Sequence, residues 1–385
     1  MTSDIGHRTS DRFSVYIHIP FCTQKCFYCD FNSYAGFERL HPSYVDALIL
    51  EMETFCQENE QRQISSIYFG GGTPSILDDG LLEKVLDGCR KCFEVSHRCE
   101  ITVESNPETL TFSKLKNLKR MGLNRLSLGF QSLDTRLLPV LGRRHTAQKA
   151  LQSFDQAKLA GFRNINLDLI YGIPGQGMIS WESTLKNVLR LRPEHISVYA
   201  LTLDDSTSIA KRISRQELPP VDDDLQAEMF SFAADLLKES GYGHYEISNF
   251  ARPGHECHHN VGYWKNGDYL GLGAGAHSHF GRVRSFNLKD PKAYIDRIKL
   301  KGSARAGEEK LTTKDVLAET IFLGLRLMEG IDLKDLNNLF DLPLDEIYAE
   351  TIEELKEEGL LEDGAKLRLT PKGVLLSNEV FSRFV

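Results

Sequence analysis

The stretch Cys22-Thr23-Gln24-Lys25-Cys26-Phe27-Tyr28-Cys29 places three cysteines at C-x3-C-x2-C spacing, directly after the apolar segment 15–20. A 4Fe-4S cluster normally takes four thiolates. No fourth cysteine stands beside this triplet. A cluster held here would therefore keep one iron without a protein ligand, and such an open iron can bind a substrate or a cofactor.

Zinc, a disulfide or three unrelated thiols are the alternatives for this triplet. Structural zinc usually takes paired C-x2-C ligands or added histidines that complete a tetrahedron. His18 lies ahead of the triplet on an expected strand and is poorly placed to complete one. The aromatic residues Phe27, Tyr28 and Phe31 would shield a cluster from water and tune its potential. The pattern therefore favours an iron-sulfur cluster over zinc.

The composition is that of a globular chain. Its 385 residues suit a barrel-like core of roughly 200 to 250 residues plus an appendage. It is 41% hydrophobic with no run of 18 apolar residues, which predicts no transmembrane segment and leaves peripheral membrane association open. A net charge of -8 argues against nucleic acid as a partner. Eight cysteines, and no apolar signal segment in residues 1–12, predict a reducing, cytoplasmic location.

Short apolar strands alternate with helical patterns through the first two hundred residues. Such β-α repeats predict an α/β fold with a parallel sheet, whose chemistry collects at the carboxyl ends of the strands. The expected strands are 15–19, 66–69, 100–103, 125–130, 164–170 and 195–201. The expected helices are 44–56, 81–93, 114–121, 147–160 and 181–191.

Glycine and polar residues stand where several of these strands end. Gly70-Gly71-Gly72-Thr73-Pro74-Ser75 would let the backbone approach a ligand and offer N–H groups to an anion, although a ligand-free glycine turn is the alternative. Glu104 ends the third strand, where a carboxylate is costly to bury unless it is paired or bound to a ligand. Gln131 follows the fourth strand, and Asp168 lies inside an otherwise apolar strand, so a structural role would demand a buried partner.

The triplet resembles the radical S-adenosylmethionine (SAM) superfamily, in which three cysteines hold a 4Fe-4S cluster and SAM chelates the fourth iron. A series of further motifs resembles the oxygen-independent coproporphyrinogen III oxidase family and its relatives, and occurs in the same order through nearly the whole chain. That resemblance implies a partial (β/α)6 TIM-like barrel. The motifs are residues 16–22, the triplet, the GGGTPS loop 70–75, the ESNPE turn 104–108, the GFQS turn 129–132 and the DLIYGIP strand 168–174.

The resemblance also implies roles for individual residues. Cys22, Cys26 and Cys29 would be the cluster ligands. The remaining positions would contact SAM, and a solvated basic turn is the alternative for the one at 143, which opens an Arg-Arg-His run. These SAM positions are Tyr16, Tyr28, Gly71, Gly72, Thr73, Glu104, Gln131, Arg143 and Asp168.

Two features separate branches within this family. The dehydrogenase branch typically has a further cysteine two residues after the third and a longer N-terminal extension, whereas this chain has Cys29-Asp30-Phe31 and only 21 residues before Cys22. Both features resemble the haem chaperone branch. The segment 257–264 also contains that branch's H-N-x-x-Y-W motif, which is associated with haem binding.

Within this motif the resemblance makes His259 the expected haem-binding residue. Neutral histidine is a usual haem ligand, and Tyr263 and Trp264 could pack on a porphyrin face. The alternative for His259 is a hydrogen-bonded structural histidine in a loop. If the segment is extended, His258 points elsewhere. The glycine-rich run 267–278 superficially resembles a dinucleotide fingerprint, but no β-α-β unit with a ribose-binding acid follows it.

The other five cysteines are expected to be structural thiols. Cys89, Cys92 and Cys99 form a C-x2-C-x6-C pattern that could suggest a second metal site. The first two fall on an expected helix and the third just before a strand, where free cysteine behaves as a small buried hydrophobe. Cys56 and Cys257 receive the same interpretation.

The chain changes character towards its end, which predicts three parts. Residues 1–290 would form the radical SAM core with the haem-associated segment, 291–310 a charged linker, and 311–385 a C-terminal helical, winged-helix-like domain. Thr312 to Asp315 would cap a helix, and a further helix is expected over 344–357. Seven acidic residues between 345 and 358 argue against binding of DNA.

Two functions follow from the resemblance. The favoured one is a haem chaperone that carries a SAM-binding 4Fe-4S cluster and passes haem to a recipient haemoprotein, for example one of the respiratory chain. The alternative is an oxygen-independent coproporphyrinogen III dehydrogenase, an enzyme that would use SAM in oxidative decarboxylation during porphyrin biosynthesis. The C-D-F ending and the H-N-x-x-Y-W segment favour the chaperone.

Overall fold

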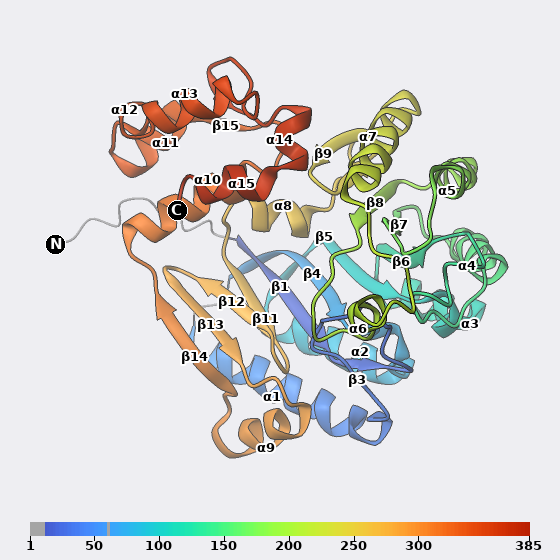
Figure 1. Ribbon diagram of the computed structural model, residues 1–385. Helices are drawn as coiled ribbons and strands as arrows, with labels where there is room; N and C mark the ends of the chain where they lie inside the picture. The colour runs from blue at the N-terminus through green and yellow to red at the C-terminus, as the bar shows by residue number, and fades with distance from the viewer. Residues whose placement is uncertain (1–11, 60–61) are drawn as a thin grey trace.

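A curved sheet surrounded by helices forms the core of the computed structural model, which describes residues 12–59 and 62–385 (Figure 1). Six neighbouring strands run parallel and make an open barrel, because the last of them does not pair with the first. These strands are β1 (Arg12–Ile19), β4 (Gln63–Gly71), β5 (Glu94–Ser105), β6 (Arg125–Gln131), β7 (Ile165–Tyr171) and β8 (His195–Ala200). All six expected strands, and the α/β fold class, are confirmed.

Helices follow the barrel strands and cover their outer face (Figure 1). They are α1 (His41–Glu58), α2 (Asp79–Cys92), α3 (Phe112–Arg120), α4 (Ala147–Leu159), α5 (Met178–Leu191) and α7 (Asp223–Glu239). Alternation along each strand sorts the side chains, because successive residues point to opposite faces. On β6, for example, Leu126, Leu128 and Phe130 are fully buried in the hydrophobic core, whereas Arg125 and Ser127 belong to the polar interior.

The sheet continues beyond the barrel at both edges. Next to β1 lie β11 (Tyr269–Leu272), β12 (His277–Phe280), β13 (Val283–Asn287) and β14 (Arg305–Lys310), and next to β8 lie β10 (Asn249–Ala251) and β9 (Gly243–Glu246). Gly271 permits close pairing of β11 with β12, since a Cβ there would lie 1.9 Å from the His277 carbonyl oxygen.

The expected linker over 291–310 is instead a folded segment. It forms α9 (Pro291–Lys301), which packs beside α1, and then β14. The sequence 305–310 is charged because β14 is an edge strand with almost every side chain exposed. Charge on an exposed edge strand discourages pairing with another chain. A charged composition is also typical of a linker, which explains why the sequence predicted a linker where the structure has α9 and β14.

The C-terminal part is helical, as predicted. Its helices are α10 (Thr313–Gly324), α11 (Leu333–Phe340), α12 (Leu344–Ile347), α13 (Ala349–Glu357), α14 (Pro371–Leu375) and α15 (Ser377–Ser382), with a two-stranded pairing of β15 (Ile331–Asp332) and β16 (Lys366–Leu367). Thr312 and Asp315 form a full capping box at the start of α10. The helix expected over 344–357 is interrupted at Tyr348, so α12 and α13 are separate.

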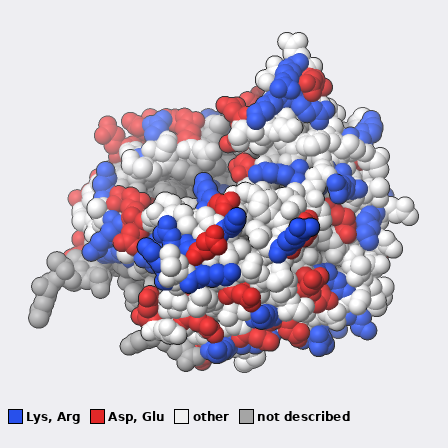
Figure 2. All heavy atoms as spheres, turned by 90° about the horizontal axis from the view of Figure 1, so that it is seen from below, with Lys and Arg blue, Asp and Glu red and all other residues white. Residues whose placement is uncertain are grey.

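Charged residues of both signs are interspersed over the face shown in Figure 2. That face carries no continuous basic surface of the kind that follows a phosphate backbone. Among the described residues no helix is both long and apolar enough to cross a membrane.

One prediction tests the packing of the outer face. Trp181 on α5 is fully buried and donates its indole N–H to the Met229 carbonyl at 2.8 Å, whereas Ile179 on the same helix is 86% exposed. Trp181→Ala should lower the free energy of unfolding by about 3–5 kcal/mol, measured by urea denaturation. Ile179→Ala should change it by no more than about 0.5 kcal/mol. Equal losses for the two variants would contradict this packing.

Candidate functional site

Three thiols line a cavity of about 520 Å3 at the carboxyl ends of the barrel strands. Cys22 ends the short strand β2 (Phe21–Cys22), and Cys26 and Cys29 lie in the loop before β3 (Tyr34–Ala35). No other described cysteine lines this cavity. Burial raises the pKa of the Cys22 and Cys26 thiols, so a bound metal would be needed to hold them as thiolates.

The donor set fits a cluster that needs three thiolates. Over residues 12–59 and 62–385, no group of three His, Cys, Asp or Glu side chains converges as the ligands of a single metal ion would. In a cluster each thiolate binds a different iron, so its ligands need not converge on one point. The same loop holds no disulfide, since all three cysteines are free.

The loop that carries these thiols, residues 22–31, is fixed against the rest of the barrel mouth. The backbone of Phe27 donates to the Leu141 carbonyl at 3.0 Å and accepts from the Ile209 amide at 2.8 Å. Its ring lies so close to Gly142 that a Cβ there would meet the ring at 2.9 Å, and Gly142 also has a φ of +73°. Glycine at 142 is therefore required for this loop to pack where it does.

The run Gly70-Gly71-Gly72 serves this packing too. A Cβ on Gly70 would lie 2.9 Å from the ring of Tyr16, one on Gly71 would meet His18 at 2.5 Å, and one on Gly72 would lie 2.6 Å from the Phe21 carbonyl oxygen and 2.9 Å from the Cys22 sulfur. Each glycine thus makes room for part of β1 or β2. Gly71 and Gly72 nonetheless line the cavity, as the resemblance implies.

Glu104 faces the cavity from the end of β5. Its two carboxylate oxygens accept hydrogen bonds from the Tyr68 hydroxyl at 2.9 Å and from the Gly71 amide at 3.2 Å. Burial raises the pKa of Glu104 to about 7, and the carboxylate of Asp168 adds to the shift. A carboxylate held in this way is ready to pair with a cationic group of a ligand.

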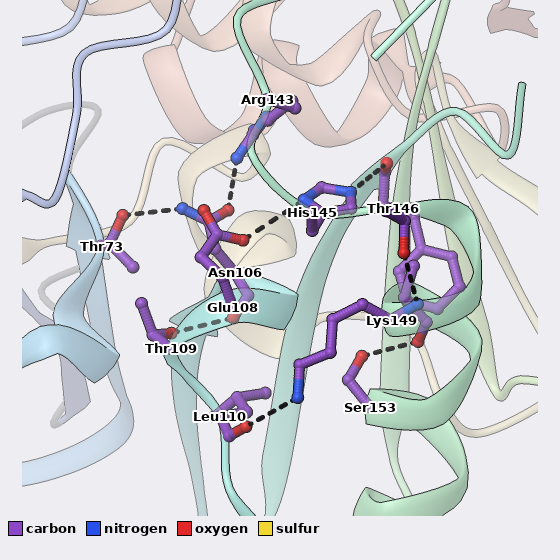
Figure 3. Close-up of polar contacts among 12 residues, drawn as sticks. Thr73, Asn106, Glu108, Thr109, Leu110, Arg143, His145, Thr146, Lys149 and Ser153 are labelled. Carbon is purple, nitrogen blue, oxygen red and sulfur yellow. Dashed lines mark hydrogen bonds and ion pairs between the residues drawn. The ribbon is translucent and has the colours of Figure 1, made fainter. Parts of the chain in front are cut away.

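A chain of hydrogen bonds centred on Arg143 connects three loops around the cavity (Figure 3). One guanidinium nitrogen donates to the Tyr28 hydroxyl at 2.6 Å, and another donates to the Asn106 amide oxygen. Asn106 in turn donates to the Thr73 hydroxyl at 2.9 Å, which lies 3.6 Å from the Cys22 sulfur. Arg143 is therefore part of the cavity wall and not a solvated basic turn.

Asp168 has the buried partners that its position in β7 demands. It accepts hydrogen bonds from Ser127 and Asn166, both at 2.8 Å. Asn166 also contacts His195 at 2.6 Å, so this network continues across the barrel interior. The interior residue that the sequence interpretation missed is Arg125, a fully buried cation that lines the cavity. Its position as the first residue of an alternating strand was the available signal.

Eleven of the twelve expected site residues outside the haem motif line the wall of this one cavity. Tyr16 is the exception and lines a neighbouring cavity of about 500 Å3. Phe31, Gly71 and Glu104 line both cavities, so the two adjoin. The members of the first wall are Cys22, Cys26, Cys29, Tyr28, Gly71, Gly72, Thr73, Glu104, Gln131, Arg143 and Asp168.

The structure places His259 differently from the expectation. Residues 258–264 form helix α8 (His258–Trp264) and not an extended segment. His259 is 1% exposed, and its ring nitrogens contact the Ser66 hydroxyl at 2.8 Å and the Tyr263 hydroxyl at 2.9 Å. Burial, with the nearby Arg125, lowers its pKa to about 3. A haem ligand at this position would require Nε2 to leave Tyr263, so that role stays a prediction.

The remaining cysteines lie in or against the hydrophobic core. Cys89, Cys99 and Cys257 are buried, and Cys56 and Cys92 are half-buried between α1 and α2. Burial raises the pKa of all five thiols. They have the surroundings of structural thiols.

Comparison with known proteins agrees with this geometry. Residues 16–188 match the Radical SAM superfamily and residues 311–376 match the HemN C-terminal domain. Together with the three-thiol cavity at the mouth of a partial barrel, these matches define a radical SAM protein with a SAM-binding 4Fe-4S cluster as its class.

Similarity over nearly the whole chain identifies the family within this class. The haem chaperone HemW of Bacillus subtilis (strain 168) is 38% identical to this chain, and the match covers 97% of this chain and 99% of the relative. HemW of Escherichia coli (strain K12) is 34% identical, and the match covers 97% of this chain and 98% of that relative. The structure of coproporphyrinogen III oxidase (HemN) from Escherichia coli, a radical SAM enzyme, superposes with a TM-score of 0.87 at 26% identity and covers 98% of this chain and 91% of that one. The chain belongs to the HemW family, which confirms the predicted branch.

A first prediction for this site concerns the thiols. Replacing Cys22, Cys26 or Cys29 with alanine removes one of only three donors, so the iron content and the brown absorbance of anaerobically reconstituted protein should collapse. Cys89→Ala and Cys92→Ala are matched controls in the same chain and should keep both nearly intact. Loss of iron from either control would contradict their structural assignment.

A second prediction concerns Glu104. Because the pKa of this carboxyl is raised to about 7, it is largely protonated below that pH, and SAM affinity should increase as the pH rises from 6 to 8. Asp168, Tyr68 and Arg125 are the ionisable groups that face it. Glu104→Gln should keep the iron content, weaken SAM binding by about tenfold in calorimetric titration, and remove this pH dependence. Unchanged affinity would remove Glu104 from the SAM site.

Proposed function

We propose that this chain is a haem chaperone that binds haem and passes it to a recipient haemoprotein, while a SAM-binding 4Fe-4S cluster occupies the barrel mouth. The observation that carries the proposal is the similarity to HemW relatives along 97% of the chain. The Cys29-Asp30-Phe31 ending of the cysteine triplet supports the same branch.

We assign the cluster to Cys22, Cys26 and Cys29 and the SAM site to the wall around them. When bound and reduced, such a cluster supplies an electron to SAM. The residues of the chain bind and orient this cofactor and exclude water. Gly71 and Gly72 keep the backbone close, Glu104 offers a carboxylate to a cationic group, and Arg143 with Tyr28 closes the side nearest Cys26.

The polar barrel interior keeps these groups in place. Asp168, Ser127 and Asn166 form a closed set of hydrogen bonds at the cavity wall, and Gln131 has a φ of +63° where β6 ends. Such a strained backbone persists only where the surrounding structure imposes it, which happens most often at binding sites. These residues would therefore position the cofactor.

We further propose that the core extends through β14, so that the described residues up to 310 form one unit and 311–385 the C-terminal domain. The sheet order and the match of residues 311–376 to the HemN C-terminal domain support that division.

We also propose a cytoplasmic location, with haemoproteins such as those of the respiratory chain as recipients. The eight cysteines, none paired among the described residues, support a reducing compartment.

The test compares the two candidate activities on one preparation. The protein is reconstituted anaerobically, supplied with SAM and a reductant, and offered haem or coproporphyrinogen III in separate reactions. We expect haem to be retained through gel filtration, to be transferred to an added apo-haemoprotein, and no protoporphyrinogen to form. Formation of protoporphyrinogen without retention of haem would assign the dehydrogenase activity instead.

A further inference from the structure

The cavity beside the cluster site is unassigned by the function above. It encloses about 500 Å3, within the roughly 300–1,000 Å3 typical of ligand pockets. Its wall comes from β1, from α8 and from the antiparallel extension of the sheet, with Leu323 of α10 on a further side. Because it shares Gly71 and Glu104 with the cluster cavity, its occupant would lie next to SAM.

Aromatic rings make up much of this wall. Tyr263 and Tyr269 pack edge to face, with ring centroids 4.6 Å apart, and Tyr16, Phe31 and Trp264 also line the cavity. The ring of Trp264 carries the Arg326 guanidinium on one face, 4.3 Å from its centroid, yet its buried indole N–H has no hydrogen-bond acceptor in the described structure. Such a wall suits a flat aromatic ligand with acceptor groups at its edge.

The opposite wall supplies an imidazole. His277 and His279 lie two residues apart on β12, so they share one face, and Arg284 stands directly opposite His279 on β13. His279 is buried, whereas His277 is exposed, lines the cavity, and rests against the ring of Phe286 with centroids 5.5 Å apart. In the described structure no hydrogen bond occupies its ring nitrogens. It is thus the available histidine, in contrast to His259.

Positive charge stands beside this histidine. Burial, with the cations of Lys289 and Arg284, lowers the pKa of His277, so its imidazole stays neutral as a haem ligand must be. Arg284 is paired with Glu319 at 2.8 Å, and its guanidinium has further N–H groups with which it can donate to a ligand. A ligand with a metal centre and peripheral carboxylates matches this combination.

We propose that this cavity is the haem site of the chain, with His277 as the iron ligand, the rings of Tyr263 and Trp264 against the porphyrin, and Arg284 as the partner of a propionate. This inference rests on the proposed chaperone function. The proposal also assigns a role to the H-N-x-x-Y-W segment. Tyr263 and Trp264 line the cavity, and His259 holds Tyr263 in position through the hydrogen bond between its Nε2 and the Tyr263 hydroxyl.

The experiment uses the full-length reconstituted chain and titrates it with ferric haem, followed by the Soret band and by electron paramagnetic resonance of the haem iron. His277→Ala should weaken binding by at least about tenfold and remove the imidazole signature, and added free imidazole should restore the spectrum. Arg284→Gln should weaken binding by about three- to tenfold without altering the iron spectrum. The iron and sulfide of the cluster should stay unchanged in both.

Two further histidines serve as controls. His258 is exposed on the same helix as His259, so His258→Ala should behave as the wild type. His259→Ala should keep the imidazole signature even if affinity falls. A wild-type spectrum in His277→Ala together with a lost signature in His259→Ala would overturn this inference while leaving the chaperone function intact. Failure of the wild-type chain to bind haem at all would instead overturn the proposed function.

Discussion

The site has one thiolate ligand fewer than a 4Fe-4S cluster has irons, because the cavity at the barrel mouth contains three thiols and the cluster has four irons. The residues around Cys22, Cys26 and Cys29 hold these thiols in place and form the binding site for the cofactor that would bind the fourth iron. Gly70 to Gly72 let β1 and β2 lie against the end of β4, and Gly142 leaves room for Phe27. Arg143 then connects the loop of the thiols to the ends of β4 and β5.

Burial gives this arrangement its chemical character. Glu104 and Asp168 are carboxyl groups inside a barrel whose interior also contains Arg125, and desolvation raises the pKa of both acids. Their hydrogen-bond partners are arranged before any ligand arrives. A positively charged cofactor would therefore stabilise the charged form of these buried carboxyl groups, as is usual in a preorganised site.

Much of this could be predicted from the sequence. Several of the barrel strands are apolar runs that end in glycine or polar residues, and these ends identified Glu104, Gln131 and the glycine run. Asp168 was identified as a carboxylate inside an otherwise apolar strand. Arg125 was missed because a cation at the start of an apolar strand is ordinarily a surface residue. Alternation along β6 was the available signal, but alternation by itself does not show that the interior face of the strand is enclosed.

Two other differences have local causes. Residues 291–310 are polar because β14 is an exposed edge strand, and sequence composition cannot distinguish such a strand from a linker. The segment 258–264 is a short helix that is held against β4 by the tertiary contact of His259 with Ser66, while the contact of His259 with Tyr263 lies within the helix. A motif identified these residues, but only the packing shows which of their side chains reach a cavity.

The central claim is that SAM completes a site with three protein ligands. Electron-nuclear double resonance of the reduced cluster, with SAM labelled with 15N at its amino group, tests it most directly. The account predicts a coupling between that nitrogen and the cluster in the wild-type chain, because an open iron is available to it. Bound SAM without any coupling would show that the fourth position is filled in another way, and would contradict the account.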